Sequence, residues 1–144
     1  MITIKVDITG IKDLMVKYRK GFIKGVREAM FVAEKWSKQS FGQPGHLQSR
    51  TDNLRRSINT AVVEKGNEVV GTIGTPVKYG AIHELGGIIK PIKGKYLKFA
   101  INGQWKSVRQ VKMPARPYLR PSITENIDKI REIIMRNVAE ESNK

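Results

Sequence analysis

AVVEKGNEVVGTIG, at residues 61–74, is the stretch that decides the fold class. Two runs rich in β-branched residues flank Gly66 and Asn67, and a glycine-containing pair in that position is typical of a tight hairpin turn. The stretch therefore predicts two antiparallel strands. The fold class then depends on the elements that lie on either side of this hairpin.

Before the hairpin the sequence predicts one strand and one long helix. Residues 2–8 alternate apolar and polar side chains, which is the period of a half-buried strand. Over residues 11–40 apolar side chains recur at steps of mostly three and four, the pattern of one face of an amphipathic helix. Gly21 and Gly25 fall within that helix, where they weaken it locally or allow another backbone to come close. Residues 40–50, rich in Gly, Pro, Gln and Ser, are expected to form a mobile loop.

Two short helices are expected close to the hairpin. Thr51 can cap a short helical turn that leads into the first strand. Thr75 and Pro76 form a good helix start, with a hydroxyl cap and a proline in the first turn. The helix VKYGAIHEL that follows is expected to stop at Gly86, because glycine is preferred just past a helix end.

The rest of the chain predicts two strands, an extended segment and a last helix. The strands are expected in YLKFAI (96–101) and QWKSVRQV (104–111), which a tight turn joins. Three prolines hold MPARPYLRP (113–121) extended, since each biases its predecessor away from helix. Ser122 and Glu125 form a capping box for the last helix. The apolar stripe of that helix consists of Ile123, Ile127, Ile130, Ile134 and Val138.

This order of elements predicts a single α+β domain over residues 1–144. A largely antiparallel sheet is expected to be packed on one face by the long N-terminal helix and the C-terminal helix, with a short helix between strands. A flexible loop near 40–50 and a mobile basic hairpin near 88–112 are expected to extend from this domain.

Composition excludes several classes of protein. The chain has no cysteine, which excludes disulfides, thiolate catalysis and cysteine-based zinc sites. No apolar run approaches the roughly 20 residues that span a bilayer, and the first ten residues do not look secretory. We therefore expect synthesis in a cytoplasm, no membrane contact and no cofactor.

The net charge of +14 is unevenly distributed. No acidic residue occurs between Glu84 and Glu125. Such a one-signed region can meet nucleic acid, an acidic protein surface or only solvent. The candidate contacts to a partner or to DNA are Lys90, Lys93, Lys95, Lys98, Lys106, Arg109 and Lys112.

HELGG, at residues 83–87, resembles the start of a zinc-protease motif but lacks its chemistry. The motif needs a second histidine at the position that Gly87 occupies, and the other histidine, His46, lies in the predicted loop. Adjacent residues on a helix point about 100° apart, which also weakens an acid–base pair of His83 and Glu84. Tyr79 lies one helical turn before His83, so an imidazole packed on Tyr79 is the favoured reading. No catalytic residue and no metal ligand is therefore predicted.

One enzymatic alternative stays open. A small basic ribonuclease of the toxin type would use His83 as its general base and Arg116 or Arg120 to hold phosphate. A small basic nucleic-acid-binding protein without catalysis is the related alternative. Nothing in the spacing of these residues specifically supports the ribonuclease.

Three stretches taken together resemble the small tail-completion, or minor tail, proteins of tailed bacteriophages and prophages. They are RTDNLRRSI at residues 50–58, YGAIHELGG at 79–87 and MPARPYLRPSI at 113–123. Members typically show an arginine-threonine-x-x-leucine entry, then a tyrosine-x-x-isoleucine-histidine-x-x-glycine helix. A proline-alanine-arginine-proline-aromatic-leucine segment comes just before their last helix. Each motif alone is weak, and the three in order are fairly specific.

The resemblance implies a non-enzymatic protein of virion assembly that acts at the head–tail junction. Such a protein would be made in the host bacterial cytoplasm and end in the virion. It would form a ring between a connector and the tail terminator or tail tube, and it could be a monomer when isolated. DNA contact is compatible with this role and is not required by it.

The resemblance also implies structural roles for the matched residues. Tyr79, His83, Gly86 and Gly87 would build the end of the short helix, and a second segment would lie across it. Arg116 would donate hydrogen bonds to the carbonyls of the two glycines or to the Glu84 carboxylate. The second segment consists of Pro114, Ala115, Arg116, Pro117, Tyr118 and Leu119, of which Tyr118 and Leu119 would fill the core.

Overall fold

The predicted hairpin forms two strands of a three-stranded antiparallel sheet in the computed structural model, which describes residues 2–6 and 18–144. Strand β2 (Asn59–Lys65) turns at Gly66 and Asn67 into β3 (Glu68–Thr75). Strand β1 (Ile2–Val6) pairs with the other edge of β3, so the order is β1-β3-β2. The strand predicted at residues 2–8 is confirmed over 2–6, and its last two residues lie outside the described ones.

Helix α2 (Arg19–Ser40) carries the apolar stripe that the sequence predicted, and this stripe packs against β2 and β3. Its side chains form the centre of the core together with Ile58 and Ile73 from the sheet side. The part of the predicted helix before residue 18 lies outside the described residues. The buried apolar residues of α2 are Phe22, Val26, Ala29, Met30 and Ala33.

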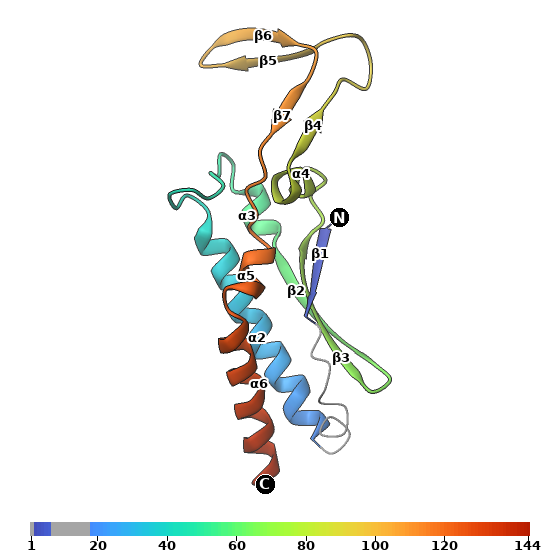
Figure 1. Ribbon diagram of the computed structural model, residues 1–144, viewed down its shortest axis with the longest axis vertical. Helices are drawn as coiled ribbons and strands as arrows, with labels where there is room; N and C mark the ends of the chain where they lie inside the picture. Colours follow the sequence, from blue (N-terminus) through green and yellow to red (C-terminus); the bar gives the residue numbers. More distant parts are fainter. Residues whose placement is uncertain (1, 7–17) are drawn as a thin grey trace.

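Helix α6 (Ile127–Ser142) lies beside α2 in Figure 1 and packs mainly against that helix. A Cβ atom added at Gly21 would come within 2.7 Å of the Val138 Cα atom, and one at Gly25 within 2.7 Å of the Ile134 Cα atom. The two glycines therefore let the helix backbones approach closely, which was one of the two effects considered from the sequence. The predicted α+β class, with an antiparallel sheet, a long helix, a C-terminal helix and a short helix between strands, is confirmed. The sequence placed both long helices on one face of the sheet, and the structure packs α2 on β2 and β3 and α6 mainly on α2.

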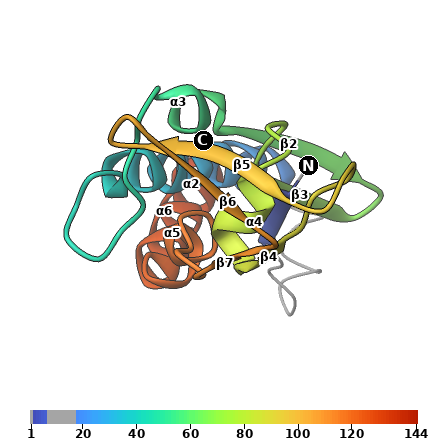
Figure 2. The ribbon, with the colours of Figure 1, turned by 90° about the horizontal axis from the view of Figure 1, so that it is seen from above.

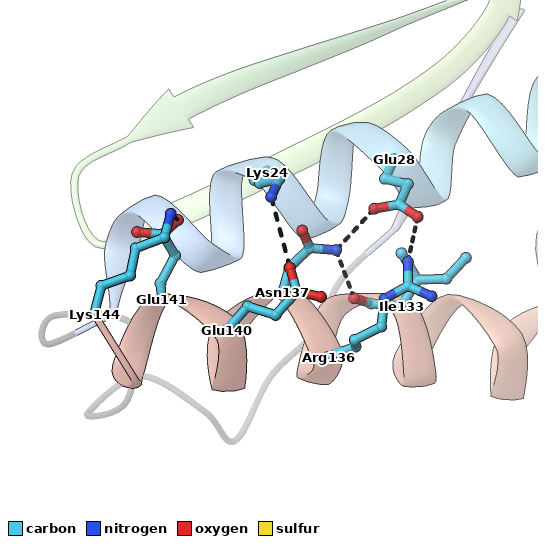
Figure 3. A network of polar contacts seen from close by, with 8 residues as sticks. All are labelled: Lys24, Glu28, Ile133, Arg136, Asn137, Glu140, Glu141 and Lys144. Atoms are coloured by element: carbon cyan, nitrogen blue, oxygen red, sulfur yellow. Dashed lines mark hydrogen bonds and ion pairs between the residues drawn. The ribbon is translucent and has the colours of Figure 1, made fainter.

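A polar network crosses the interface of α2 and α6 (Figure 3). Asn137 is 1% exposed, and its Nδ2 atom donates to the Glu28 carboxylate and to the Ile133 carbonyl, both at 2.9 Å. Arg136 pairs with the same carboxylate. The Oδ1 atom of Asn137 is buried and has no hydrogen-bond partner among the residues that the structure describes. A buried amide of this kind favours one register of the two helices over others.

The first two short helices begin later than the sequence predicted. Helix α3 (Asn53–Ser57) starts after Asp52, which has a left-handed backbone (φ 58°), so Thr51 is not its cap. The Thr75 hydroxyl accepts from the Val77 N–H at 3.1 Å as a cap would, but Thr75 still belongs to β3. Helix α4 (Gly80–Leu85) has its N-cap at Tyr79, four residues after the predicted cap, and ends at Gly86 as predicted.

The predicted capping box at the start of the last helix is wrong. Ser122 lies inside a separate short helix, α5 (Arg120–Thr124), and its hydroxyl donates to the Leu119 carbonyl at 2.5 Å. Helix α6 begins at Ile127, after a break. The chain enters helix earlier than predicted because another side chain takes up the free N–H groups of α5, as described below.

Residues 87–113 form an extension that we call the arm, seen at the top of Figure 1. Strand β4 (Gly87–Ile89) pairs with β7 (Val111–Met113), and β5 (Leu97–Ile101) pairs with β6 (Gln104–Val108), both antiparallel. The predicted hairpin at 96–111 is confirmed. Its second strand is shorter than predicted, because residues 111–113 pair with β4, which the sequence did not predict. The C-terminus lies at the opposite end of the molecule (Figure 1).

Candidate functional site

The three sequence stretches at 50–58, 79–87 and 113–123 meet at the base of the arm, in a region that we call the joint. Gly80 marks the point of contact. A Cβ atom added there would lie 2.7 Å from the Tyr118 hydroxyl and 3.2 Å from the Leu54 Cδ1 atom. A side chain larger than hydrogen would therefore force the three stretches apart.

The end of α4 docks against the segment that returns from the arm. Gly86 has a φ of 70° and ends the helix, and its N–H donates to the Ile82 carbonyl at 2.8 Å. A Cβ atom at Gly86 would lie 2.8 Å from the Ala115 nitrogen, so both the backbone angle and the space require glycine. The Arg116 N–H donates to the His83 carbonyl at 2.8 Å and fixes the crossing.

Glu84 holds the start of α5 through its buried carboxylate. The residue is 4% exposed, and its Oε2 atom accepts from the N–H groups of Tyr118 and Leu119 at 2.8 and 2.9 Å. Its Oε1 atom accepts from the Arg120 N–H at 2.8 Å. One carboxylate thus satisfies free N–H groups at a helix start, where negative charge is also favoured by the helix dipole. Sequence reasoning considered Glu84 mainly as a potential acid–base residue and missed this role.

Tyr118 and Leu119 lie in the core, with exposures of 1% and 0%. The Tyr118 hydroxyl donates to the Gly80 carbonyl at 2.9 Å, and its ring packs edge-on against Phe41 at 5.3 Å between centroids. Burial, with a smaller effect of the Glu84 carboxylate, raises the pKa of Tyr118 above its usual range. This segment therefore anchors the return of the arm to the body.

The predicted side-chain contact of Arg116 is wrong. Within residues 2–6 and 18–144 its guanidinium makes no hydrogen bond or ion pair with Glu84 or with the carbonyls of Gly86 and Gly87. The side chain of Arg116 is exposed, and the residue contacts α4 through its backbone N–H, which donates to the His83 carbonyl. The carboxylate that it was expected to reach already accepts three backbone hydrogen bonds. Pro114 and Pro117 are also exposed.

His83 packs edge-on against Tyr79 with ring centroids 6.0 Å apart, as the sequence predicted. Burial, and to a lesser extent the charge of Arg116, lowers the pKa of His83 and so favours the neutral ring. Glu84 points to α5 and gives this histidine no acid partner. The two rings line a small pocket of about 150 Å³ with residues 47–54. This geometry serves packing and does not form an acid–base pair.

The arm carries all seven basic residues that the sequence singled out as partner contacts, and all seven are exposed. It also carries six exposed large hydrophobic side chains. These are Ile88, Ile89, Ile92, Tyr96, Ile101 and Trp105. The arm is therefore both basic and apolar on its surface. Its mobility stays a prediction.

Across the part of the chain that the structure describes, no group of three or more His, Asp or Glu side chains could hold a metal ion. No helix in that part is long and apolar enough to cross a membrane. The chain is thus an α+β protein with two distinct features. The residues of the three stretches pack together in the joint, and the joint carries the arm, an exposed extension that is basic and apolar.

Comparison with known families then identifies the chain. Residues 29–139 match the model of the phage virion morphogenesis family, which is more than half of the chain, and the chain belongs to that family. The match includes the joint and the whole arm. Comparison with curated proteins and with solved structures finds no significant match. The suspected family is confirmed, and with it a role in building a phage particle.

Proposed function

We propose that this protein is a non-enzymatic structural component that acts at the head–tail junction of a phage or prophage virion. It assembles there as a ring, as a tail-completion or neck protein. Its neighbours are a connector on one side and the tail terminator or tail tube on the other. The protein is made in the host bacterial cytoplasm and ends in the virion. Family membership supports the virion role, and the arm supports the assembly role.

Exposed aliphatic side chains along residues 85–92, at and just after the base of the arm, are the observation that carries the assembly role. Leu85, Ile88 and Ile92 are 63%, 53% and 100% exposed. Exposed aliphatic side chains that gather in one region are typical of an interaction surface. The arm also consists of two-stranded ribbons, which are marginally stable in water without further packing. A neighbouring copy in the ring would cover these side chains.

The joint supplies the rigidity that a ring requires. A ring closes when each copy uses one surface against a different surface of the next copy at a fixed rotation. The Glu84 carboxylate and the Gly86 contact fix the direction in which the arm leaves the body. Residues of the joint are thus positioning residues for the arm.

A complementation experiment tests the proposal. The parent phage or prophage lacking this gene should produce filled heads and tails that stay apart in electron micrographs, and the wild-type chain should restore joined particles. The variant Ile88→Glu/Ile92→Glu should fold and fail to restore them. The matched control Phe31→Glu/Val63→Glu changes two exposed apolar residues of the body and should complement. Full complementation by the folded arm variant would contradict the assembly role of the arm.

A further inference from the structure

The basic side chains of the body and those of the arm differ in whether they are neutralised. Seven ion pairs link described residues, and all seven lie in the body. Examples are Arg19 with Glu64 at 2.7 Å and Lys38 with Glu34 at 2.6 Å. Residues 87–113 contain seven Lys or Arg and no acidic residue, and none of the seven pairs with any described acid. The arm therefore presents uncompensated positive charge.

The β5–β6 hairpin has one half-buried face and one open face. Directly opposed residues share a face, so the pairs Lys98–Ser107 and Ala100–Trp105 lie together, and all four are exposed. Leu97 and Val108 oppose each other on the second face and are half-buried. Figure 2, which looks onto the end of the molecule that carries the arm, shows the hairpin extending across that end.

A hollow on the hairpin is lined from both faces. Trp105 and Lys98 belong to the open face, whereas Lys106, which opposes Phe99, belongs to the second face. Trp105 is 78% exposed, a large exposed fraction for an indole. It lines an open hollow of about 410 Å³ together with Lys98, Lys106 and Ser107. Ammonium groups bind phosphate oxygens, and a serine hydroxyl can donate to them. An indole offers a large apolar surface that can pack on the sugars of the backbone.

We propose that the β5–β6 hairpin binds double-stranded DNA through its phosphate backbone, without sequence preference. A two-stranded antiparallel ribbon has the cross-section that a major groove about 12 Å wide admits. Lys98 and Lys106 contact phosphates from the hairpin itself, and Arg109 does so from the segment that follows it. This activity goes beyond the proposed function, because DNA binding requires neither the ring nor a neighbouring copy.

Duplex DNA fits the open face better than an acidic protein surface does. The exposed aliphatic residues Ile88, Ile89 and Ile92 lie outside the hairpin, in and after β4. Ile101 is exposed within the hairpin but lies on its second face, opposite Gln104. The hairpin's open face instead carries lysine, serine and one indole. The fully buried centre of a protein–protein interface is usually more apolar than this face.

The test uses the full chain and a fluorescently labelled duplex of about 30 base pairs, with anisotropy measured between roughly 50 and 200 mM salt. Each phosphate contact contributes about 0.9 to the slope of log affinity against log salt. The variant Lys98→Gln/Lys106→Gln/Arg109→Gln should lower that slope by about 2 to 3 and weaken binding at least tenfold at the lowest salt. Trp105→Ala should weaken binding with the slope unchanged.

A charge-matched control separates a site from general attraction. Lys35→Gln/Lys65→Gln/Lys129→Gln removes three exposed body lysines that lack an ion pair with a described acid, and it leaves the same net charge as the arm variant. This control should keep the wild-type slope. Equal losses in both variants, or no binding at about 50 mM salt, would overturn the proposal. Polyglutamate that competes as well as duplex DNA at equal charge would assign the hairpin to an acidic protein surface and also overturn it.

The DNA-binding test and the head–tail joining test can fail independently of each other. Head–tail joining that fails with the Ile88→Glu/Ile92→Glu variant concerns the base of the arm, whereas DNA affinity concerns its tip. Thermal unfolding followed by circular dichroism should show both triple variants folded, because all six substituted side chains are exposed.

Discussion

Glu84→Gln is the substitution that most sharply tests how the arm is fixed to the body. The carboxylate accepts three backbone N–H groups, from Tyr118, Leu119 and Arg120, at 2.8 to 2.9 Å. Glutamine has nearly the same shape but a single acceptor oxygen. That oxygen can keep the two N–H groups of Tyr118 and Leu119, and the new amide NH₂ then faces the Arg120 N–H. One hydrogen bond is lost and two donors oppose each other.

The cost follows from competing effects. Loss of a hydrogen bond to a charged group costs about 1.5–3 kcal/mol, and a buried donor left unpaired adds a part of its desolvation penalty. The neutral amide is easier to bury than a carboxylate that is 4% exposed, which offsets some of this loss. We expect a net destabilisation of about 2 kcal/mol, which lowers Tm by roughly 4–8 °C in a chain of this size.

Urea unfolding of the purified chain measures this difference directly, with Glu132→Gln as the matched control. Glu132 lies on the exposed surface of α6 and forms no hydrogen bond or ion pair with a described residue. The control should change the free energy of unfolding by less than about 0.5 kcal/mol. A Glu84→Gln variant as stable as this control would refute the account of the joint.

Three further substitutions test other contacts. Gly25→Ala should lower the free energy of unfolding by about 1–3 kcal/mol in urea unfolding, because its Cβ would lie 2.7 Å from the Ile134 Cα atom, whereas Lys35→Ala on the exposed side of α2 should not. Tyr118→Phe leaves the Gly80 carbonyl without its donor and should cost about 1–2 kcal/mol near neutral pH. Since the pKa of Tyr118 is raised, the folded chain keeps a proton that the unfolded chain loses, so wild-type stability should fall above pH 10 or so and Tyr118→Phe should fall less. Since the pKa of His83 is lowered, the unfolded chain binds a proton first as pH falls below about 6.5, and stability should decrease there; His83→Gln should lose that part of the pH dependence in thermal melts.

The sequence predicted elements that depend on local periodicity. The β2–β3 hairpin, the described part of α2 and the β5–β6 hairpin each carry a pattern that is complete within one stretch. An element that buries one face repeats apolar residues at its own helical or strand period, so the pattern can be recognised without knowing what the element packs against. The close approach at Gly21 and Gly25 was also considered from the sequence, since two glycines four residues apart share a helix face.

Contacts between distant residues were not predictable in the same way. Strands β4 and β7 have three residues each and exist because Gly87 pairs with Met113, far along the chain. Glu84 is separated by 34 to 36 residues from the three N–H groups that it binds. The sequence near Glu84 offers one hint of this contact. Gly80 lies one turn earlier on the same helix face and makes room for Tyr118. The contact expected for Arg116 was wrong because its backbone, and not its charge, docks on α4.

Electron cryomicroscopy of purified virions can locate this protein and so test its proposed place at the head–tail junction. We expect a closed ring of copies at the end of the tail that meets the head, with the base of each arm covered by the neighbouring copy. A virion that joins head and tail without this chain would contradict the claim. So would density for the chain at the far end of the tail, or as single copies with the arms uncovered.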